Sequence, residues 1–300
     1  MKKTCLVFIA AAMFVASRAD AGNCRWLTPP TDIAFGIYSV FGTGSLTGTS
    51  TYTIRCTPNT EGVITLTTGA NASNYFPRYM ANAGFLLAYN LYDDAANTNV
   101  LGDGTGGTTT RVVFNGQPGS INFTDTIYAA APQGSDVGPG TYTDTVTAVL
   151  SWDNGAGTDS RTFMVTTVVQ AECTVSTVPV AFGNYDPVAA HAASPLDGTG
   201  SINVYCTPGT VATVSLGDGL YFAAGSRRMS GPPTSFLNYQ LYREATRTSI
   251  WSTSPNTVSG TSTSRFTPIG GGLVVYGRVP AGQDAIIGMH NDTVQATVNY

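Results

Sequence analysis

The amino-acid sequence repeats itself, and this internal duplication constrains the fold more than any other feature. Three motifs of the first half recur in the same order in the second half. They are IAFGIY (33–38) and VAFGNY (180–185), YTIRCTPNT (52–60) and INVYCTPGT (202–210), and GTYTDTVTAVLSW (140–152) and GMHNDTVQATVNY (288–300). Self-similarity of this length indicates a duplicated domain. We therefore expect two similar domains, with the boundary between them inside 153–172.

Each copy is built from short segments in which side chains alternate between two faces. In the segment 51–56, Tyr52, Ile54 and Cys56 point one way and the residues between them point the other way. Similar segments are 63–67, 85–91, 111–114 and 142–150. Turn signals such as GDGTGG and GQPGS separate them. Several short strands with regular turns predict an all-β fold, with an antiparallel β-sandwich in each copy.

The first 21 residues have the pattern of a secretory signal peptide. Two lysines precede an apolar run that is too short to span a bilayer well, and Ala19-Asp20-Ala21 is a small-x-small cleavage site. We expect cleavage after Ala21, and the alternative is that the segment stays as an N-terminal anchor. No later stretch of the sequence is long and apolar enough for a membrane helix. The sequence therefore predicts export.

Charged side chains are few and mostly acidic, which argues against partners that are rich in phosphate groups. They make up 11% of the chain, acidic residues outnumber Lys and Arg by 18 to 14, and no lysine follows Lys3. Such a composition does not favour binding to phosphate groups. We therefore expect neither nucleic acid nor an anionic membrane surface as a partner.

Four cysteines follow the signal peptide, and they predict two disulfide bonds. An even number in an exported chain indicates disulfides, and three pairings are possible in principle. The repeat selects Cys24–Cys56 and Cys173–Cys206, whose sequence separations are almost equal. Each bridge is expected to stabilise the fold by about 3–4 kcal/mol. A zinc site is the rival interpretation, and it is weak because the chain has no CxxC motif and only 2 histidines.

The repeated motifs also resemble a known family. AFG followed by a tyrosine, CTP, Arg-x-Met ahead of L-x-Y-x-L-Y, and G-x-x-x-D-T-V near the end of each copy are similar to the spore coat protein U domain. This family includes the pilins of archaic, Csu-type chaperone–usher pili. The match covers almost all of the chain beyond residue 21, twice. It departs at His290, which stands where the first copy has Tyr142, and at Met80 and Met229, whose distances from their cysteines differ by one.

The resemblance implies a fold and a set of partners. Family members are incomplete immunoglobulin-like sandwiches that lack their final strand, and an N-terminal extension of the next subunit fills the gap by strand addition. The implied partners are a periplasmic chaperone, an outer-membrane usher and the next pilin subunit. No cofactor and no metal are implied. The implied location is the cell surface, in a pilus, after passage through the periplasm.

The segment 161–172 decides how this chain would join such a fibre. It follows the last strand of the first copy through the turn-rich DNGAGTDS, so we expect it to fold back and complete the first copy in cis. The residues expected to fill the groove are Phe163, Val165, Thr167, Val169 and Ala171. Burial of the larger ones would contribute about 5–9 kcal/mol before entropy costs. The expected division is 1–21 signal peptide, 22–160 N-terminal adhesin-like domain, 161–172 completing strand and 173–300 C-terminal pilin-like domain.

The second copy is then left without its final strand, and we expect its groove to be filled in trans. In ordinary pilins the donor extension lies just before the first cysteine, and cleavage after Ala21 leaves only Gly22 and Asn23 in that place. The chain is therefore expected to accept a donor strand and to offer none. In this respect it resembles the two-domain tip adhesins of archaic pili, which mediate attachment to surfaces and biofilm formation.

Two apolar loops of the first copy are the candidate attachment sites. Tip subunits of the family attach to abiotic or host surfaces through apolar loops of the N-terminal domain. The candidate residues are Ile37, Tyr38, Val40 and Phe41 in the first loop and Tyr75, Phe76 and Tyr79 in the second. Exposed aromatic residues grouped on loops mark binding sites. The alternative is that these residues belong to the core or to the packing between the domains.

Other classes of function have less support in the sequence. An enzyme is not expected, because His191 and His290 are the only imidazoles and neither lies in a nucleophile or metal motif. Asp144 and Asp292 recur at the same place in both copies, which favours a role in the fold. A structural pilin or coat subunit is one alternative to the tip adhesin. A carbohydrate-binding tip lectin is the other.

Overall fold

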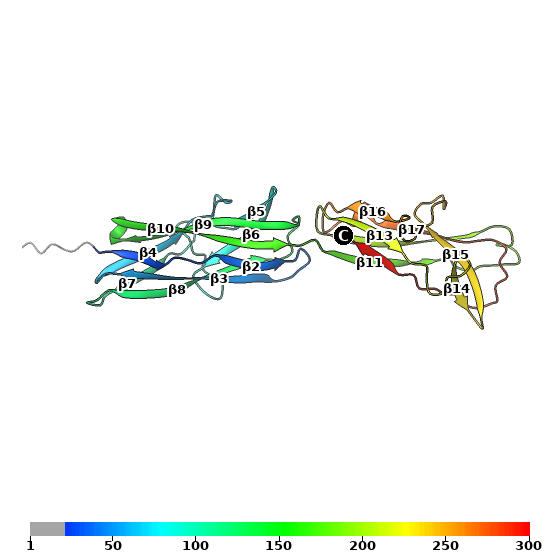
Figure 1. Ribbon diagram of the computed structural model, residues 1–300, viewed down its shortest axis with the longest axis horizontal. Coiled ribbons are helices and arrows are strands. Elements are labelled where there is room, and N and C mark those ends of the chain that lie inside the picture. The colour runs from blue at the N-terminus through cyan, green and yellow to red at the C-terminus, as the bar shows by residue number, and fades with distance from the viewer. Residues whose placement is uncertain (1–21) are drawn as a thin grey trace, which may run out of the picture.

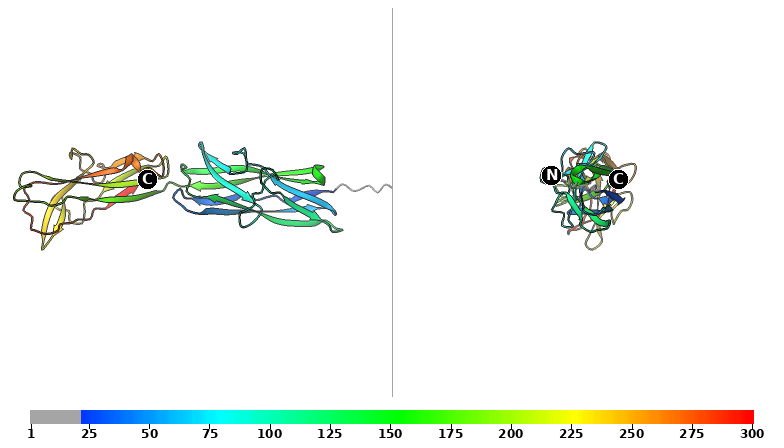
Figure 2. Two further views of the ribbon diagram at one scale, coloured as in Figure 1. Left: turned by 180° about the vertical axis from the view of Figure 1, so that it is seen from behind. Right: turned by 90° about the vertical axis from the view of Figure 1, so that its left-hand side faces the viewer.

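The computed structural model describes residues 22–300, which form two all-β domains joined end to end (Figure 1). The predicted signal peptide, 1–21, lies outside the described residues. Seen from behind and along the long axis, the two domains follow one another along a single axis (Figure 2). The predicted all-β class is confirmed, with mainly antiparallel sheets in both domains and an incomplete second sandwich. Within residues 22–300, no helix is long and apolar enough to cross a membrane.

The N-terminal domain comprises ten strands. In chain order they are β1 (Cys24–Thr28), β2 (Ile33–Tyr38), β3 (Ser45–Cys56), β4 (Thr60–Leu66), β5 (Arg78–Asn82), β6 (Phe85–Tyr92), β7 (Arg111–Asn115), β8 (Ile121–Pro132), β9 (Gly140–Trp152) and β10 (Gly157–Val169). A single-turn 3-10 helix, η1 (Asp153–Gly155), joins β9 to β10.

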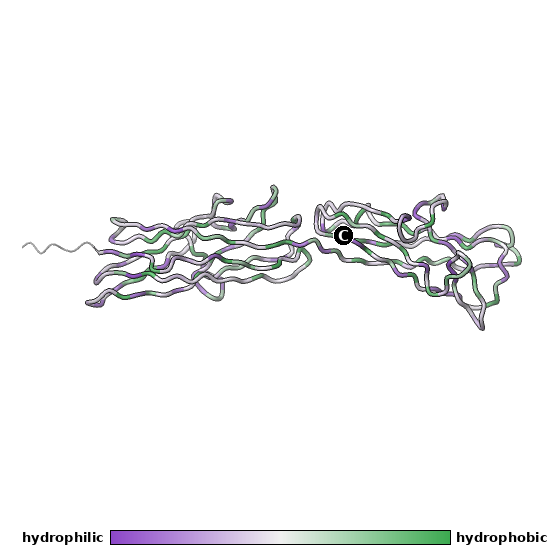
Figure 3. The backbone as a smooth tube through the Cα atoms, in the orientation of Figure 1, coloured by the Kyte–Doolittle hydropathy of each residue, from purple (hydrophilic) through white to green (hydrophobic). Residues whose placement is uncertain are grey.

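These strands pack as two layers over one core. In one layer β1, β3, β8 and β6 are hydrogen-bonded in that order, and in the other β7, β4, β9, β10 and β2 are. β5 pairs with both β6 and β9 and so connects the layers. The core between them extends from Trp26 on β1 to Val169 at the end of β10. Along the strands, apolar and polar residues follow one another, as the alternation predicts (Figure 3).

The C-terminal domain is smaller in strand content and in core. Its strands are β11 (Cys173–Ala181), β12 (Leu196–Cys206), β13 (Val211–Leu216), β14 (Arg227–Gly231), β15 (Ser235–Tyr242), β16 (Val258–Thr261), β17 (Leu273–Val279) and β18 (Ala296–Asn299). They form one sheet in the order β11-β12-β17-β15-β14 and a second in the order β16-β13-β18. A 3-10 turn, η2 (Ile269–Gly271), precedes β17.

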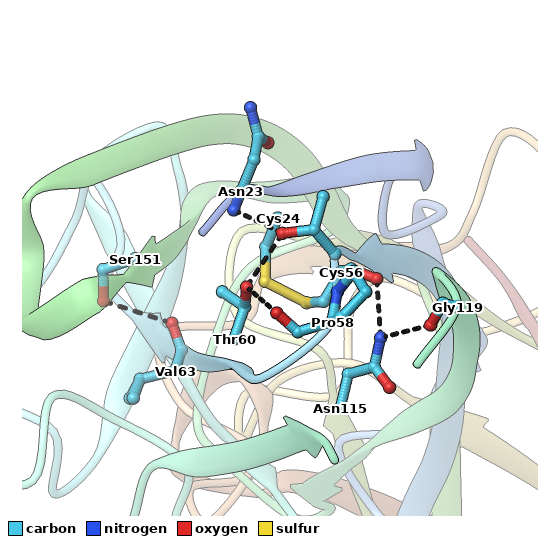
Figure 4. The surroundings of a disulfide bond; sticks show 10 residues. Asn23, Cys24, Cys56, Pro58, Thr60, Val63, Asn115, Gly119 and Ser151 are labelled. Carbon is cyan, nitrogen blue, oxygen red and sulfur yellow. Dashed lines mark hydrogen bonds between the residues drawn. A yellow bond between two sulfur atoms is a disulfide. The ribbon is translucent and has the colours of Figure 1, made fainter. Parts of the chain in front are cut away.

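Both predicted disulfide bonds are present, and they occupy equivalent places. Cys24–Cys56 joins β1 to β3, and Cys173–Cys206 joins β11 to β12. Figure 4 shows the first bridge together with Asn115, whose Nδ2 donates a hydrogen bond to Cys56 O at 3.0 Å. The bridge and its polar neighbours therefore fix β1, the edge strand of its layer, to β3.

Each domain also contains a hydrogen-bonded aspartate–tyrosine pair at equivalent positions, buried in the N-terminal domain and partly exposed at Asp292 in the C-terminal domain. Tyr89 Oη donates to Asp144 Oδ2 at 2.6 Å, and Tyr239 Oη donates to Asp292 Oδ2 at 2.7 Å. In both domains the other carboxylate oxygen accepts a backbone N–H from the loop after β4 or β13. Burial raises the pKa of Asp144 above its ordinary value. These hydrogen bonds within each domain are in keeping with a role of the paired aspartates in the fold.

Candidate functional site: an open groove in the C-terminal domain

Strand β10 lies between β9 and β2 in the N-terminal domain. It pairs antiparallel with β9 over its whole length, from Gly157 opposite Trp152 to Val169 opposite Gly140, and it runs parallel to β2. The side chains that it buries in the core are Phe163, Val165, Thr167 and Val169, each at most 2% exposed. The N-terminal sandwich is thus closed by a strand that precedes Cys173 in the chain.

The ends of β10 differ from the predicted 161–172. The strand starts earlier, at Gly157, because the turn after β9 closes within η1, where Asp153 and Gly155 adopt left-handed φ values of 51° and 90°. It also stops earlier, at Val169, where β9 begins opposite it. The prediction that Ala171 fills the groove is therefore wrong. Ala171 lies beyond the paired region and is exposed.

The pairing of β10 with β2 contains a bulge, and a threonine closes it. The register shifts between Thr166 and Val168, so that two residues of β2, Phe35 and Gly36, face Thr167 alone. Gly36 has a left-handed φ of 81°. Thr167 Oγ1 donates a hydrogen bond to Gly36 O at 2.9 Å. The carbonyl at the bulge is thereby paired by a side chain of β10.

Among the described residues, the C-terminal domain has no counterpart of β10. Residues 288–300, which match β9, form a strand only at β18, and residues 180–185, which match β2, have no strand pairing after Ala181. On β9 the residues of the inner face are buried. Their counterparts are all partly exposed, namely His290, Asp292, Val294, Ala296 and Val298.

An open groove takes the place of the missing strand. Two cavities of about 830 and 460 Å³ lie next to each other and share Val180, Phe182, Met229 and His290 in their walls. Further apolar wall residues are Leu216, Leu237, Leu241, Val275, Val279 and Val294. The groove is therefore mostly apolar, and it runs between the two segments that correspond to β2 and β9.

The first wall of the groove has the same local structure as in the N-terminal domain. The centroids of the Phe35 and Tyr89 rings lie 6.4 Å apart, and those of Phe182 and Tyr239 lie 5.9 Å apart. The glycine after each phenylalanine has a φ of 81° in the first copy and 77° in the second. The ring contact of the phenylalanine and the left-handed glycine therefore occur in both domains, beside a strand in one and beside an open groove in the other.

The residues predicted in the first attachment loop are only partly at the surface. Ile37 is 60% exposed, but Tyr38 and Val40 are buried and Phe41 is half-buried against the core. Tyr38 also donates its hydroxyl hydrogen to Pro132 O at 2.8 Å. The prediction that Tyr38 and Val40 bind a surface is therefore wrong, because the end of β2 directs both into the core.

This loop lies at the junction of the two domains. Glu172 in the linker accepts hydrogen bonds from Ser39 Oγ at 2.6 Å and from the Phe41 N–H at 3.3 Å. A second carboxylate acts across the junction, since Asp136 accepts hydrogen bonds from Ser264 Oγ at 2.7 Å and from the N–H of the next residue at 2.8 Å. The first loop is thus engaged in holding the domains together.

The second predicted loop presents one residue mainly to solvent. Phe76 is 53% exposed, whereas Tyr75 and Tyr79 are half-buried. Tyr75 donates its hydroxyl hydrogen to Leu66 O at 2.9 Å, and its ring centroid lies 4.9 Å from the guanidinium carbon of Arg78. Phe76 is therefore the residue of this loop that is most available for contact with a surface.

The end of the N-terminal domain that faces away from the C-terminal domain carries apolar residues that the sequence analysis does not single out. Val112 and Phe114, on β7, are 53% and 58% exposed. Phe114 and Trp152 line a hollow of about 330 Å³ together with Glu61 and Asp153. The residues that line the hollow belong to η1, the start of β4 and neighbouring strands. These elements lie at the end of the N-terminal domain that is farther from the C-terminal domain (Figure 1). The sequence signal is the segment RVVF, which is apolar on both of its faces.

Comparisons with known proteins agree with this architecture. The Spore Coat Protein U domain matches residues 10–149 and 159–297. Protein U of Myxococcus xanthus is 42% identical over 132 residues, which are 40% of this chain and 70% of that protein. Among solved structures, the chain is similar to the CsuC–CsuE chaperone–tip adhesion subunit pre-assembly complex from the archaic chaperone–usher Csu pili of Acinetobacter baumannii. That likeness, with a TM-score of 0.51 and 15% identity over 93% of this chain and 100% of the other, is one of fold.

The boundaries of the family matches bear on β10. The second match begins at residue 159, so it includes most of a strand that lies in the N-terminal domain. The two matches together account for nearly the whole chain, and they coincide with the internal repeat. On this basis the protein belongs to the Spore Coat Protein U domain family, of which it contains two domains in tandem.

Proposed function

We propose that this protein is a subunit of a chaperone–usher pilus and that its C-terminal domain accepts a donor strand from the next subunit. One observation carries the proposal: β10 fills the groove of the N-terminal domain, while the equivalent groove of the C-terminal domain is open. By analogy with β10, the donor pairs antiparallel with 288–300 and parallel with 180–185. This is strand addition to an exposed sheet edge.

The open groove also supports a chaperone as partner. Apolar walls and unpaired strand edges are an aggregation hazard until they are covered. We expect a periplasmic chaperone to cover the groove and an outer-membrane usher to exchange the chaperone for the donor subunit. The solved complex with a similar fold pairs a chaperone with a tip adhesion subunit, which supports this assignment.

The direction of the donor strand supports a position at the pilus tip. β10 runs towards the junction, parallel to β2, and a donor parallel to 180–185 runs from the junction towards the far end of the C-terminal domain (Figure 1). If the donor segment precedes the folded body of its subunit, as in the pilins of this family, that body lies beyond the far end. The N-terminal domain is then left at the outer end of the fibre.

We assign attachment to the free end of the N-terminal domain and to exposed residues near it. Val112, Phe114 and Trp152 give this end an apolar character, and Phe76 adds an exposed aromatic ring on the same domain. Exposed apolar groups of this kind suit abiotic or host surfaces and the formation of biofilm. Of the predicted attachment residues, Ile37 lies on the strand end that leads into the junction loop, so we expect it to contribute less than Phe76.

Immunogold electron microscopy tests the position of the subunit. Cells that express the protein are labelled with antibody against the N-terminal domain, and we expect gold at fibre ends only. The control is a strain whose copy carries Val294→Arg in the groove wall, in which gold should be lost from fibres because the donor no longer fits. Gold along the whole fibre, or on a coat without fibres, would instead establish a structural pilin or coat subunit.

A carbohydrate-binding tip is the second candidate, and the terminal hollow favours it. Phe114 and Trp152 offer two aromatic faces, and Asn59, Glu61 and Ser151 offer polar groups beside them. Aromatic faces with a few polar groups are a common arrangement in ligand sites. Inhibition of adhesion by free sugars but not by detergent would favour this function. The reverse result would favour attachment through apolar contact.

A further inference from the structure

We propose that the strand that fills the C-terminal groove carries a threonine or serine opposite Gly183, flanked on the same face by apolar residues. This inference rests on the proposed function, since it specifies the chemistry of the donor strand. It follows from the bulge that β10 meets in the N-terminal domain and from the recurrence of the same bulge-forming segment in the second copy.

In the N-terminal domain the bulge presents one carbonyl to a hydroxyl group of β10. Phe35 and Gly36 together face Thr167, and the left-handed φ of Gly36 breaks the regular pairing at this point. Thr167 is 2% exposed, so its hydroxyl needs a partner within the protein, whereas Gly36 is exposed on β2, the outer strand of the layer. Thr167 Oγ1 donates to Gly36 O at 2.9 Å, and this hydrogen bond pairs the buried hydroxyl with the carbonyl at the bulge.

The C-terminal domain offers the same acceptor without a donor. Gly183 has a φ of 77°, and the preceding Phe182 stacks edge-on against Tyr239 as its counterpart does in the N-terminal domain. Within residues 22–300, no hydrogen bond reaches Gly183 O. A strand that enters the groove would bring its inner face next to this carbonyl. A threonine or serine at that position would gain a hydrogen bond that an apolar residue cannot form.

The opposite wall of the groove is polar at the same level. Thr167 lies opposite Tyr142 on β9, and the repeat places His290 at the position of Tyr142. His290 lines both cavities, with Nε2 3.0 Å from Ser235 Oγ and Nδ1 3.1 Å from Gly288 O. The slot for the hydroxyl-bearing residue thus lies between a backbone carbonyl on one side and an imidazole on the other.

The positions beside this slot are apolar, which sets the pattern of the donor. Val165 and Phe163 lie two and four residues before Thr167 on the buried face of β10, and Val169 lies two residues after it. At the corresponding level of the C-terminal groove, Val294 stands where Val146 faces Phe163. The fitting donor therefore reads large apolar, x, apolar, x, Thr or Ser, x, apolar.

The chain itself supplies the probe for a test. The purified chain from Gly22 to Tyr300 is titrated with a fluorescent peptide of the sequence RTFMVTTVVQ, residues 161–170, and with variants at the position of Thr167. We expect the peptide and its Thr167→Ser variant to bind with similar affinity. The Thr167→Val variant should bind about fivefold more weakly, because it lacks the hydrogen bond to Gly183 O. A Thr162→Val peptide is the matched control and should bind like the parent, since Thr162 faces solvent on β10.

The possible outcomes test the role of the hydroxyl group separately from strand acceptance by the groove. Equal or tighter binding of the Thr167→Val peptide, with binding lost in the chain variant Val294→Arg, would overturn the hydroxyl slot and leave strand acceptance intact. Absence of binding by every peptide, or binding that Val294→Arg does not change, would overturn strand acceptance and the slot together. Weaker binding of the Thr167→Val peptide alone, dependent on Val294, supports both.

Discussion

The two domains share their motifs but differ in one strand, and the difference in burial follows that strand. Tyr142 and Val146, on the strand next to β10, are completely buried, whereas their counterparts His290 and Val294 are partly exposed beside the open groove. The disulfide bond, the phenylalanine–tyrosine contact and the aspartate–tyrosine hydrogen bond are the same in both domains. These local contacts therefore form without the final strand, whose role is to close the sandwich.

The path of the first strand in each domain also differs with the presence of the final strand. In the N-terminal domain the chain leaves β3 after Thr28 and resumes in the other layer as β2, parallel to β10. In the C-terminal domain β11 stays on β12 as far as Ala181, opposite Thr199. Without a final strand, the other layer offers no partner to which the first strand could cross. The comparison shows that the final strand provides a pairing partner for two segments. In the N-terminal domain these are its two neighbours in the sheet, β9 and β2.

Removal of β10 should have the largest effect. A chain of residues 22–156 loses the partner of β9 and β2 and the side chains of Phe163, Val165 and Val169. Burial of these groups is worth about 5–9 kcal/mol, which is comparable with the whole stability of a domain, roughly 5–15 kcal/mol. We expect no cooperative unfolding by circular dichroism, and recovery when a peptide of residues 157–170 is added. A stable, monomeric 22–156 would contradict the completing role of β10.

Addition of the strand to the other domain is the converse experiment. A second copy of residues 153–170 fused after Tyr300 should fold back into the C-terminal groove as β10 does in the N-terminal domain. We expect the calorimetric transition of the C-terminal domain to rise by about 10 °C or more, because apolar surface is buried without a partner chain. The same extension with Asp at the positions of Phe163 and Val165 is the control and should cause no rise. An equal rise in both would mean that the groove is not the binding site.

Single substitutions on the two faces of β10 sharpen the comparison further. Phe163→Ala removes a buried ring and should lower the free energy of unfolding of the N-terminal domain by about 3–5 kcal/mol. Met164→Ala, on the exposed face, should change it by about 0.5 kcal/mol or less. Chemical denaturation of the two variants measures both values. Similar losses at the two positions would show that β10 does not bury the face carrying Phe163.

Much of this architecture could be predicted from the sequence, and the exceptions have a common physical cause. The disulfide pairing follows from the equal spacing of the repeat, and the buried face of β10 follows from alternation at Phe163 and Val165. The sequence predicts Tyr38 and Val40 at the surface, but both are buried, and the Tyr38 hydroxyl is bonded to Pro132 O at the end of β8. Likewise, the exposure of Phe114 depends on β7 being an edge strand. Contacts between segments that are distant in sequence decide whether these residues are buried or exposed. The alternation of residues within one segment carries no information about such contacts.

Substitution of Thr167 should have a smaller effect on stability. The result bears on both domains, because the AFG segment that Thr167 contacts is repeated in the second one. Thr167→Val keeps the shape of the side chain but removes the hydrogen bond to Gly36 O, so we expect a loss of about 1 kcal/mol in the stability of the N-terminal domain. Thr167→Ser keeps the hydroxyl and should cost less than about 1.5 kcal/mol. Urea denaturation distinguishes them. If Val stabilised the domain relative to Thr, the bulge carbonyl would not need the hydroxyl, and the requirement inferred for the donor strand would lose its basis.

The smallest effect on stability is expected at the junction, where the change should appear in shape instead. Glu172 and Asp136 accept hydrogen bonds from the facing domain, and neither contributes to a domain core. In the double variant Glu172→Ala/Asp136→Ala, the unfolding temperatures of both domains should stay within about 2 °C of the parent. Domains without such ties move relative to one another by default, so the distribution of interatomic distances from small-angle X-ray scattering should broaden. The double variant Asp218→Ala/Asp284→Ala removes the same charge from exposed positions outside the junction and should leave the distribution unchanged. An unchanged distribution in the junction variant would mean that the linker alone sets the angle between the closed domain and the open one.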